Sequence, residues 1–245
     1  MNLRLQNILI IGAGHGLGLA LTQECKKMFP TSSIFTTFRR KELSSELMKQ
    51  DVSKGQIDPL DELKVQNFCE SLPQLDLVIN CVGTLELEIN EKIVGPEKSL
   101  KDINTDNLVE IFKINSFVTP LWAKFLKSKF SKENPSVFST LSAMVGSITE
   151  NEIGGWYGYR ASKAALNMFL KNIAIEYTRS RLKTSVVGIH PGTTRTKLSS
   201  NYLKSVKHKV WEPNEAAKNI IKVLTSCPAE GTGLFKNWDG RTISF

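Results

Sequence analysis

Short apolar runs alternate with helical patterns along almost the whole chain. A short apolar run that ends at a glycine or a polar residue is typical of a buried strand, whereas apolar residues three and four apart predict a helix. The strands predicted in this way are Asn7–Ile11, Ser33–Phe38, Leu75–Asn80, Pro135–Leu141, Thr184–His190 and a last short one, Gly233–Trp238. The predicted helices are Leu17–Phe29, Asp61–Leu72, Asn104–Phe130, Trp156–Arg181 and Pro213–Ser226.

Single residues mark where some of these elements start, stop or bend. Asp61 precedes an apolar-periodic segment and is a suitable N-cap. The long pattern Asn104–Phe130 contains Pro120, so we expect one helix that bends there. Two stretches, Glu86–Leu100 and Gly192–Trp211, have no clear period and are predicted to be loops.

The order of the elements predicts the fold class. Strands that alternate with helices form parallel βαβ units with right-handed crossovers. We therefore expect an α/β protein with a Rossmann-type, doubly wound parallel sheet and helices on both of its faces. No repeat, low-complexity tract or linker divides the chain, so residues 1–245 are predicted to form a single domain. Ligands bind at the carboxyl ends of such strands, where the loops 86–100 and 192–211 are expected.

Composition narrows the class of protein. Apolar residues make up 41% of the chain and charged residues 23%, which is typical of a soluble globular protein. No apolar run approaches the ~20 residues of a membrane-spanning helix, and the first residues lead into a glycine loop instead of a cleavage site. The four cysteines form no CxxC pair and lie apart from the three histidines. We expect a cytoplasmic protein with reduced thiols, no metal and no membrane partner.

The net charge of +8 leaves several partners open. A basic chain can bind nucleic acid, a membrane surface, an anionic cofactor or none of these. The basic residues are spread along the chain, and no helix-turn-helix, RRM or zinc-finger signature accompanies them. We therefore expect no nucleic-acid partner.

A glycine-rich turn follows the first predicted strand and opens the first predicted helix. Its glycines are Gly12, Gly14, Gly16 and Gly18, with His15 and Leu17 between them. Glycine lets the backbone approach a pyrophosphate, and a helix N-terminus supplies free N–H groups. The Gly12-xxx-Gly16-x-Gly18 spacing departs from GxGxxG, and the absence of a following Lys-Ser/Thr excludes a P-loop. A turn without a ligand remains the alternative.

The end of the second predicted strand bears on the choice of nucleotide. NAD sites usually place an acid about 20 residues beyond the glycine turn, where it binds the ribose 2′-OH. This chain has Arg39 and Arg40 there, followed by Lys41. Because guanidinium groups bind phosphate in a bidentate way and keep their charge, the sequence favours NADP(H) over NAD(H). Solvated loop arginines are the alternative.

Tyr159 and Lys163 form the second candidate motif. They lie four residues apart, on one face of the predicted helix. A phenol has an ordinary pKa near ~10, and a neighbouring ammonium lowers it. The sequence thus predicts an acid/base pair, whereas Tyr157 has Ala161 in the corresponding position.

The chain resembles the short-chain dehydrogenase/reductase superfamily over essentially its whole length. The resemblance rests on the glycine turn, Asn80-Cys-Val-Gly83, Asn115, Tyr159–Lys163 and Pro191-Gly192, in the family's order and spacing. Within the superfamily the chain is similar to the C-factor-like branch, through three segments: 154–163, His190-Pro-Gly-Thr193 and 238–245.

The resemblance implies a role for further residues. Asp58 lies 22 residues before Asn80 and, in preference to Asp51, matches the position that contacts adenine. Asn80, Val82 and Gly83 would line the adenosine side, and Asn115 would hold a water in a proton relay. Pro191, Gly192, Thr193 and Thr196 match positions around the nicotinamide amide and the pyrophosphate.

Two positions depart from the family pattern. Ile11 stands where the family usually has Thr. The family's catalytic serine lies three residues before a glycine that matches Gly146, and this position is Ala143. A one-residue shift along a strand turns a side chain to the opposite face. We take Ser142 as the candidate and Ser147 as the reserve.

These features together imply an NADP(H)-dependent oxidoreductase that reduces a carbonyl or oxidises an alcohol. Tyr159, Lys163, Ser142 and Asn115 would carry the chemistry. Trp156, Leu198, Tyr202 and Leu203 indicate an apolar substrate pocket, and the family resemblance implies a homodimer or homotetramer. The alternatives are an NADP(H)-binding sensor without turnover and a nucleotide-fold methyltransferase, which would leave Tyr159 and Lys163 without a role.

Overall fold

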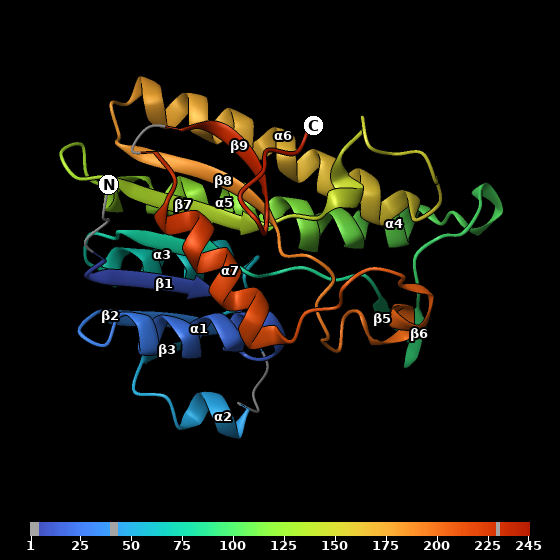
Figure 1. Ribbon diagram of the computed structural model, residues 1–245, viewed down its shortest axis with the longest axis horizontal. Helices are drawn as coiled ribbons and strands as arrows, with labels where there is room; N and C mark the ends of the chain where they lie inside the picture. The colour runs from blue at the N-terminus through green and yellow to red at the C-terminus, as the bar shows by residue number, and fades with distance from the viewer. Residues whose placement is uncertain (1–4, 40–43, 229–230) are drawn as a thin grey trace.

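A computed structural model describes residues 5–39, 44–228 and 231–245. Seven parallel strands form one sheet in the order β3-β2-β1-β4-β7-β8-β9 (Figure 1). The strands are β1 (Asn7–Ile11), β2 (Ser33–Phe38), β3 (Ser53–Gln56), β4 (Leu77–Asn80), β7 (Ser136–Leu141), β8 (Thr184–His190) and β9 (Gly231–Asn237). The predicted doubly wound parallel sheet is confirmed.

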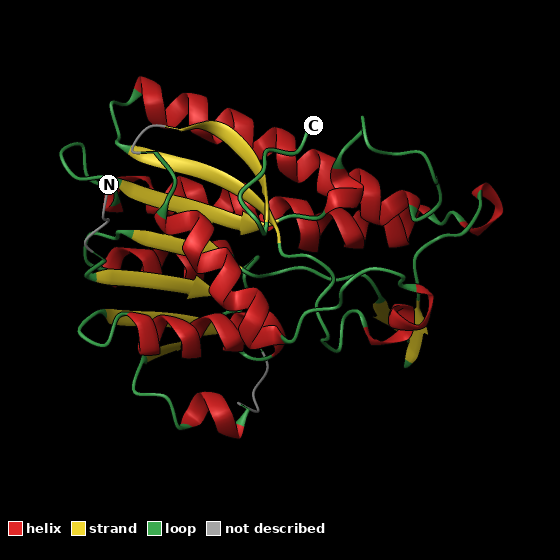
Figure 2. Ribbon diagram, viewed as in Figure 1, coloured by secondary structure: helices red, strands yellow, loops and turns green. Residues whose placement is uncertain are grey.

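Helices cover both faces of this sheet, as Figure 2 shows. Helices α1 (Gly16–Met28) and α7 (Pro213–Thr225) pack together on one face. The other face carries α3 (Glu62–Ser71), α4 (Thr105–Phe112), α5 (Val118–Leu126) and α6 (Tyr157–Arg179). A short helix, α2 (Ser45–Met48), follows β2 and precedes β3 along the chain. Asp61 is the N-cap of α3, as predicted, and accepts a hydrogen bond from the Lys64 N–H at 3.1 Å.

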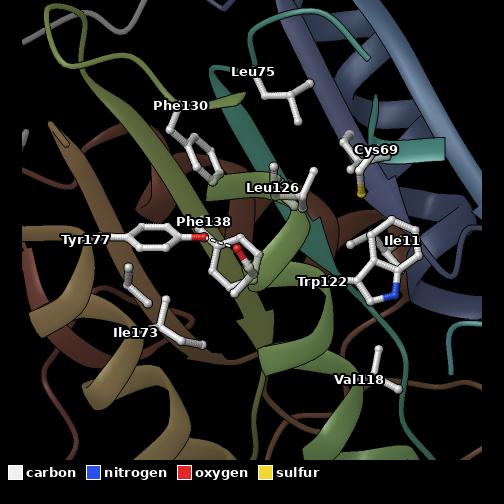
Figure 3. Packing of buried hydrophobic residues seen from close by; sticks show 14 of the residues in the cluster. Ile11, Cys69, Leu75, Val118, Trp122, Leu126, Phe130, Phe138, Ile173 and Tyr177 are labelled. Carbon is white, nitrogen blue, oxygen red and sulfur yellow. Dashed lines mark hydrogen bonds between the residues drawn. The ribbon is translucent and has the colours of Figure 1, made fainter. Parts of the chain in front are cut away.

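Two apolar cores lie on the two faces of the sheet, because successive side chains of a strand point to opposite sides. In β1, Leu9 and Ile11 join the core on the α3–α5–α6 face, whereas Ile8 and Ile10 join the core under α1 and α7. The core on the α3–α5–α6 face includes several aromatic side chains, among them Trp122 and Tyr177 (Figure 3). The polar atoms of these two side chains have hydrogen-bond partners: Trp122 Nε1 donates to the Pro59 carbonyl at 3.1 Å, and Tyr177 Oη donates to the Ala123 carbonyl at 2.7 Å.

The helical segment after residue 104 is interrupted earlier than predicted. A π-helical turn, Lys113–Phe117, separates α4 from α5, and Pro120 lies within the first turn of α5. Pro120 has no N–H for the carbonyl four residues before it, so a regular α-helix cannot pass through this point. The break therefore precedes the proline, and it carries Asn115.

The sequence patterns missed the shortest elements. Strand β3 is the polar edge of the sheet, so it has no apolar run. The stretch 86–100, predicted to be a loop, contains an antiparallel hairpin of β5 (Leu87–Ile89) and β6 (Lys92–Val94). Elements of three residues give no measurable period. Among the described residues, no helix is long and apolar enough to cross a membrane.

Candidate active site

A tight glycine turn joins β1 to α1. Gly12 and Gly16 have φ angles of 81° and 56°, which favour glycine. The N–H groups of Gly12 and Ala13 donate to the Thr37 carbonyl at 3.1 and 2.7 Å, which fixes the turn against β2. A Cβ on Gly18 would lie 2.2 Å from the Gly12 carbonyl oxygen. The turn can close only because residue 18 has no side chain.

The start of α1 has the features of an anion site. His15, at the N-cap position, makes no capping hydrogen bond, and the first turn of α1 has no acidic residue. A Cβ on Gly16 would lie 3.7 Å from Thr196, so these residues face each other across a narrow space. Leu17 is partly buried and packs against the core under α1 and α7. The turn thus fits a diphosphate group.

Arg39 follows the end of β2 and is exposed. A Cβ on Gly14 would lie 3.4 Å from Phe38 Cβ, so the end of β2 adjoins the glycine turn. Arg40 lies outside the described residues. Asp58 follows β3 on the other side of β2, and its carboxylate accepts a hydrogen bond from the Leu60 N–H at 3.0 Å. The residues predicted to bind the adenosine part of the cofactor therefore follow three neighbouring strands, β1, β2 and β3.

The segment after β4 lies against both the glycine turn and Lys163. Asn80 is buried: its Nδ2 donates to Thr119 Oγ1 at 3.0 Å, and its Oδ1 accepts from the Val82 N–H at 3.0 Å. Val82 packs over Gly12, since a Cβ on Gly12 would lie 3.0 Å from Val82 Cγ2. A Cβ on Gly83 would lie 3.3 Å from Lys163 Nζ. Asn80 thus shapes the turn, and Gly83 leaves room for Lys163.

Tyr159 and Lys163 lie in the first two turns of α6, as predicted. Lys163 is buried, and its Nζ donates to the Leu141 carbonyl at 2.9 Å and lies 5.9 Å from the centre of the Tyr159 ring. Burial lowers the pKa of Lys163 to about 8. Burial also raises the pKa of Tyr159 to about 12, because it desolvates the phenolate; this is opposite to the lowering predicted from the sequence.

Asn115 is held in the π turn by two neighbours. Its Oδ1 accepts from the Thr84 N–H at 2.7 Å, and its Nδ2 donates to the Thr84 carbonyl at 2.9 Å and to Ser162 Oγ at 3.1 Å. Ser162 Oγ in turn donates to the Tyr159 carbonyl at 2.9 Å. Asn115 therefore ties the segment after β4 to the turn of α6 that carries Tyr159.

The two candidate serines form hydrogen bonds with residues outside this group. Ser142 follows β7, is buried, and donates to Oδ1 of Asn167 at 2.7 Å. Ser147 is also buried, and its Oγ accepts from the Glu150 N–H at 3.2 Å. This geometry differs from that expected of a hydroxyl that binds substrate. Asn167 was missed in the sequence, because an isolated helical Asn carries no signal of its own.

A cavity of about 470 Å³ opens at Tyr159. Trp156 and Tyr202, two of the residues expected to form an apolar pocket, line it, whereas Leu198 and Leu203 do not. Most of the remaining lining belongs to the segment 85–102, together with Asn107, Ile111 and Asn201. The cavity is thus mostly apolar and aromatic, with charged groups contributed by Glu97, Lys98 and Asp102.

The segment after β8 turns sharply and then leaves the sheet. Pro191 follows His190, and Gly192 has a φ of 75°; a Cβ on it would lie 2.8 Å from Trp211. The segment returns to its start, because the Trp211 N–H donates to the Thr193 carbonyl at 2.8 Å and the Arg195 N–H to the Trp211 carbonyl at 2.9 Å.

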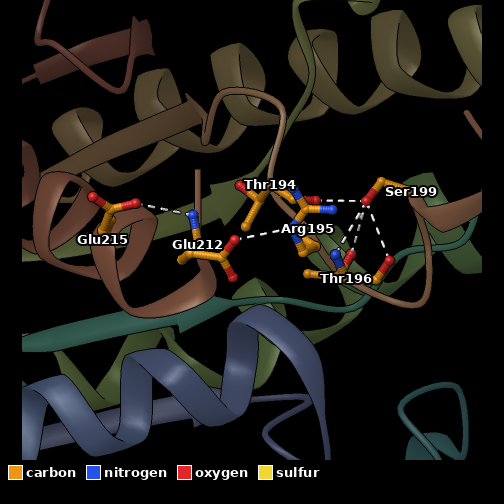
Figure 4. A network of polar contacts seen from close by, with 6 residues as sticks. All are labelled: Thr194, Arg195, Thr196, Ser199, Glu212 and Glu215. Atoms are coloured by element: carbon orange, nitrogen blue, oxygen red, sulfur yellow. Dashed lines mark hydrogen bonds and ion pairs between the residues drawn. The ribbon is translucent and has the colours of Figure 1, made fainter. Parts of the chain in front are cut away.

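Polar contacts fix the base of this segment (Figure 4). Ser199 Oγ donates to the Thr194 carbonyl at 2.5 Å and accepts from the Thr196 N–H at 3.1 Å, and Arg195 pairs with Glu212 at 2.9 Å. Thr193 Oγ1 lies 2.8 Å from Nε2 of His208. Thr196 is thereby held beside the glycine turn.

Comparison with known proteins identifies the family to which this chain belongs. The model of the family described as "short chain dehydrogenase" matches residues 6–207. The chain belongs to the short-chain dehydrogenase family. It is therefore a member of an oxidoreductase family, as the motifs predicted.

Individual relatives are distant. An uncharacterized oxidoreductase of Schizosaccharomyces pombe is 27% identical, with 96% of each chain covered. The C-signal protein of Myxococcus xanthus is 24% identical over 66% of this chain and 94% of its own, which supports the predicted branch weakly. The NADPH-bound carbonyl reductase from chicken fatty liver has a TM-score of 0.83 at 22% identity, with 99% of this chain and 95% of that chain covered.

Proposed function

We propose that this short-chain dehydrogenase is an NADP(H)-dependent carbonyl reductase. The observation that carries the proposal is that Tyr159 lines a cavity of about 470 Å³ while Lys163, on the same helix face, reaches the turn at Gly83. The Tyr159 hydroxyl could thus reach a substrate in the cavity, close to the strand ends where we propose that the nucleotide binds. The bound NADPH of the chicken carbonyl reductase supports the choice of cofactor.

Three groups of residues in this chain would hold the cofactor. The turn Gly12–Gly18 and Thr196 would hold the diphosphate, and Arg39 would pair with a 2′-phosphate. Gly83 leaves space for Lys163, which would hold the nicotinamide ribose. When bound, NADPH supplies the hydride that reduces the carbonyl carbon.

Tyr159 gives its proton to the carbonyl oxygen as the carbon is reduced. Its raised pKa keeps the hydroxyl protonated at neutral pH, which is the form that a reductase needs. The Lys163 ammonium stabilises the phenolate that forms. Asn115 fixes the first turns of α6 and, as the resemblance implies, holds a water for reprotonation. Ser142 stabilises α6 through its hydrogen bond to Asn167. Tyr159 is the residue that would contact the carbonyl oxygen of the substrate.

A cofactor-binding sensor without turnover is the second candidate. The observation that favours it is the position of Ser142 and Ser147, both buried and hydrogen-bonded away from the cavity. Such a protein would bind NADPH and reduce no ketone.

Fluorescence titration with NADPH and NADH, followed by a panel of ketones and aldehydes, separates these candidates. We expect tighter binding of NADPH and consumption of NADPH with at least one carbonyl compound. Binding without consumption across the panel would establish the sensor, and binding of neither cofactor would refute both.

A further inference from the structure

Two aromatic side chains that contact each other line the cavity beside Tyr159. Trp156 precedes α6, and Tyr202 comes from the short helical turn Ser200–Ser205 in the segment after β8. The two rings are 5.1 Å apart with their planes at 70°, and the Trp156 ring is 6.1 Å from that of Tyr159. The three rings thus form a continuous aromatic surface that ends at the proposed proton donor.

Trp156 occupies a strained backbone conformation. Gly154, Gly155 and Trp156 have successive φ angles of 68°, 64° and 51°. Glycine adopts this region freely, whereas a bulky residue there is strained. Strain of this kind persists where surrounding contacts enforce it, and it often marks a functional position.

Glu97 supplies those contacts. Its backbone carbonyl accepts from the Trp156 N–H at 2.5 Å, and its carboxylate accepts from the Gly158 N–H at 3.0 Å. A Cβ on Gly158 would lie 2.9 Å from the same carboxylate. Glu97 therefore fits closely against the start of α6 and fixes Trp156 from the segment 86–100.

Glu86 holds Tyr202 in a comparable way. One oxygen of its carboxylate, Oε1, accepts from Tyr202 Oη at 2.9 Å and from Asn201 Nδ2 at 3.0 Å. The two partners are more than a hundred residues from Glu86 in the sequence. Figure 1 shows the turn that carries Tyr202 beside the β5–β6 hairpin.

We propose that Glu86 and Glu97 position Tyr202 and Trp156 as one aromatic wall of the cavity, and that this wall selects carbonyl compounds with an aromatic ring near the carbonyl carbon. The substrate class rests on the reductase function proposed above. An edge-to-face contact between aromatic rings adds to the energy of apolar burial. A flat ring that packs against this wall from the cavity gains that contact while its carbonyl faces Tyr159, whereas a saturated ring gains burial alone.

The test compares benzophenone with dicyclohexyl ketone, which share a carbon skeleton and differ in aromaticity. Because the two ketones differ in intrinsic reactivity, the quantity measured is the ratio of their kcat/KM values in each variant relative to the original protein. We expect the ratio to favour benzophenone about three- to tenfold less in Tyr202→Leu and Trp156→Leu. Tyr202→Phe, which keeps the ring, should lose less.

The positioning role of Glu86 is tested separately. Glu86→Ala should lower the ratio, chiefly through a higher KM for benzophenone, because Glu86 does not touch the reacting atoms. Glu86→Gln keeps an oxygen acceptor and should restore the ratio. The matched control is Glu88→Ala, an exposed glutamate of the same hairpin that does not line the cavity. It should change neither the ratio nor the unfolding temperature.

Binding of the two ketones in the presence of NADP⁺, where no hydride is available, separates the two proposals. Preference for benzophenone without any turnover with NADPH would reject the reductase function and leave the aromatic wall in place. Turnover with an unchanged ratio in folded Tyr202→Leu, Trp156→Leu and Glu86→Ala would overturn the aromatic wall alone. Neither turnover nor preference would overturn both.

Discussion

The proposed nucleotide side and the proposed substrate side of the site are built from different parts of the chain. On the nucleotide side, the glycine turn offers backbone groups: it has four glycines and a helix N-terminus, all within residues 12–18. On the substrate side, the cavity is made by side chains from segments that are distant in sequence, such as Leu87 and Tyr202. The first construction tolerates few residue types, whereas the second tolerates many, so the two sides should respond differently to mutation.

The largest effect is expected where the two sides meet. Tyr159→Phe removes the proposed proton donor and keeps the ring, so kcat for ketone reduction should fall about 10²- to 10⁴-fold. NADPH affinity, measured by fluorescence titration, should change little. Tyr157→Phe is the control, because Tyr157 is a neighbouring exposed tyrosine that does not line the cavity. Full activity in Tyr159→Phe would remove Tyr159 from the mechanism.

On the nucleotide side, a single methyl group should be costly. In Gly18→Ala the new Cβ meets the Gly12 carbonyl, so unfolding in urea should show a loss of about 1–3 kcal/mol, together with weaker NADPH binding. Gly14→Ala places its Cβ at an ordinary contact distance from Phe38 and should change stability by about 0.5 kcal/mol or less. Equal losses in the two variants would show that the clash at Gly12 does not govern the turn.

The pH dependence reports on Lys163. Its pKa is lowered to about 8, so its ammonium is present below that pH and is lost above it, while Tyr159 stays protonated. The kcat/KM for reduction should therefore fall about tenfold per pH unit above about pH 8. Lys163→Arg keeps the charge, and whatever activity it retains should be flat through this range. A wild-type profile flat to pH 10 would contradict the assignment.

The smallest effect is expected at the exposed edge of the nucleotide side. Arg39→Ala should weaken NADPH binding about tenfold and leave NADH binding nearly unchanged, since solvent screens an exposed pair with phosphate. Arg179→Ala, an exposed arginine at the end of α6, is the control and should change neither affinity. Equal weakening of both nucleotides in Arg39→Ala would mean that Arg39 does not read the 2′-phosphate.

The same contrast explains how much could be predicted from the sequence. β1, β2 and β8 begin and end at the predicted residues, because each is a buried apolar run in a parallel sheet. The glycine turn and the Tyr159–Lys163 spacing depend on local geometry, so they also could be found. The single-domain division and the roles of the site residues stay predictions.

The remainder depended on contacts that sequence patterns do not encode. The hairpin β5–β6 is too short to show a period, and Glu86 and Glu97 look like ordinary surface glutamates until Tyr202 and Trp156 are placed beside them. The direction of the Tyr159 pKa shift depended on burial, which a motif cannot show. The orientation of Ser142 depended on Asn167, a partner 25 residues away.

The π turn Lys113–Phe117 means that the long helical segment holds one residue more than a regular helix of the same rise would accommodate. That surplus residue turns Asn115 toward Thr84. Deleting one residue of the π turn would remove this surplus and turn Asn115 away from Thr84, while Pro120 would still prevent a regular α-helix from continuing through this point. The π turn therefore fixes the direction in which the Asn115 side chain points. An insertion or deletion here, of a size that an exposed loop tolerates, would disconnect the segment after β4 from the turn of α6 that carries Tyr159.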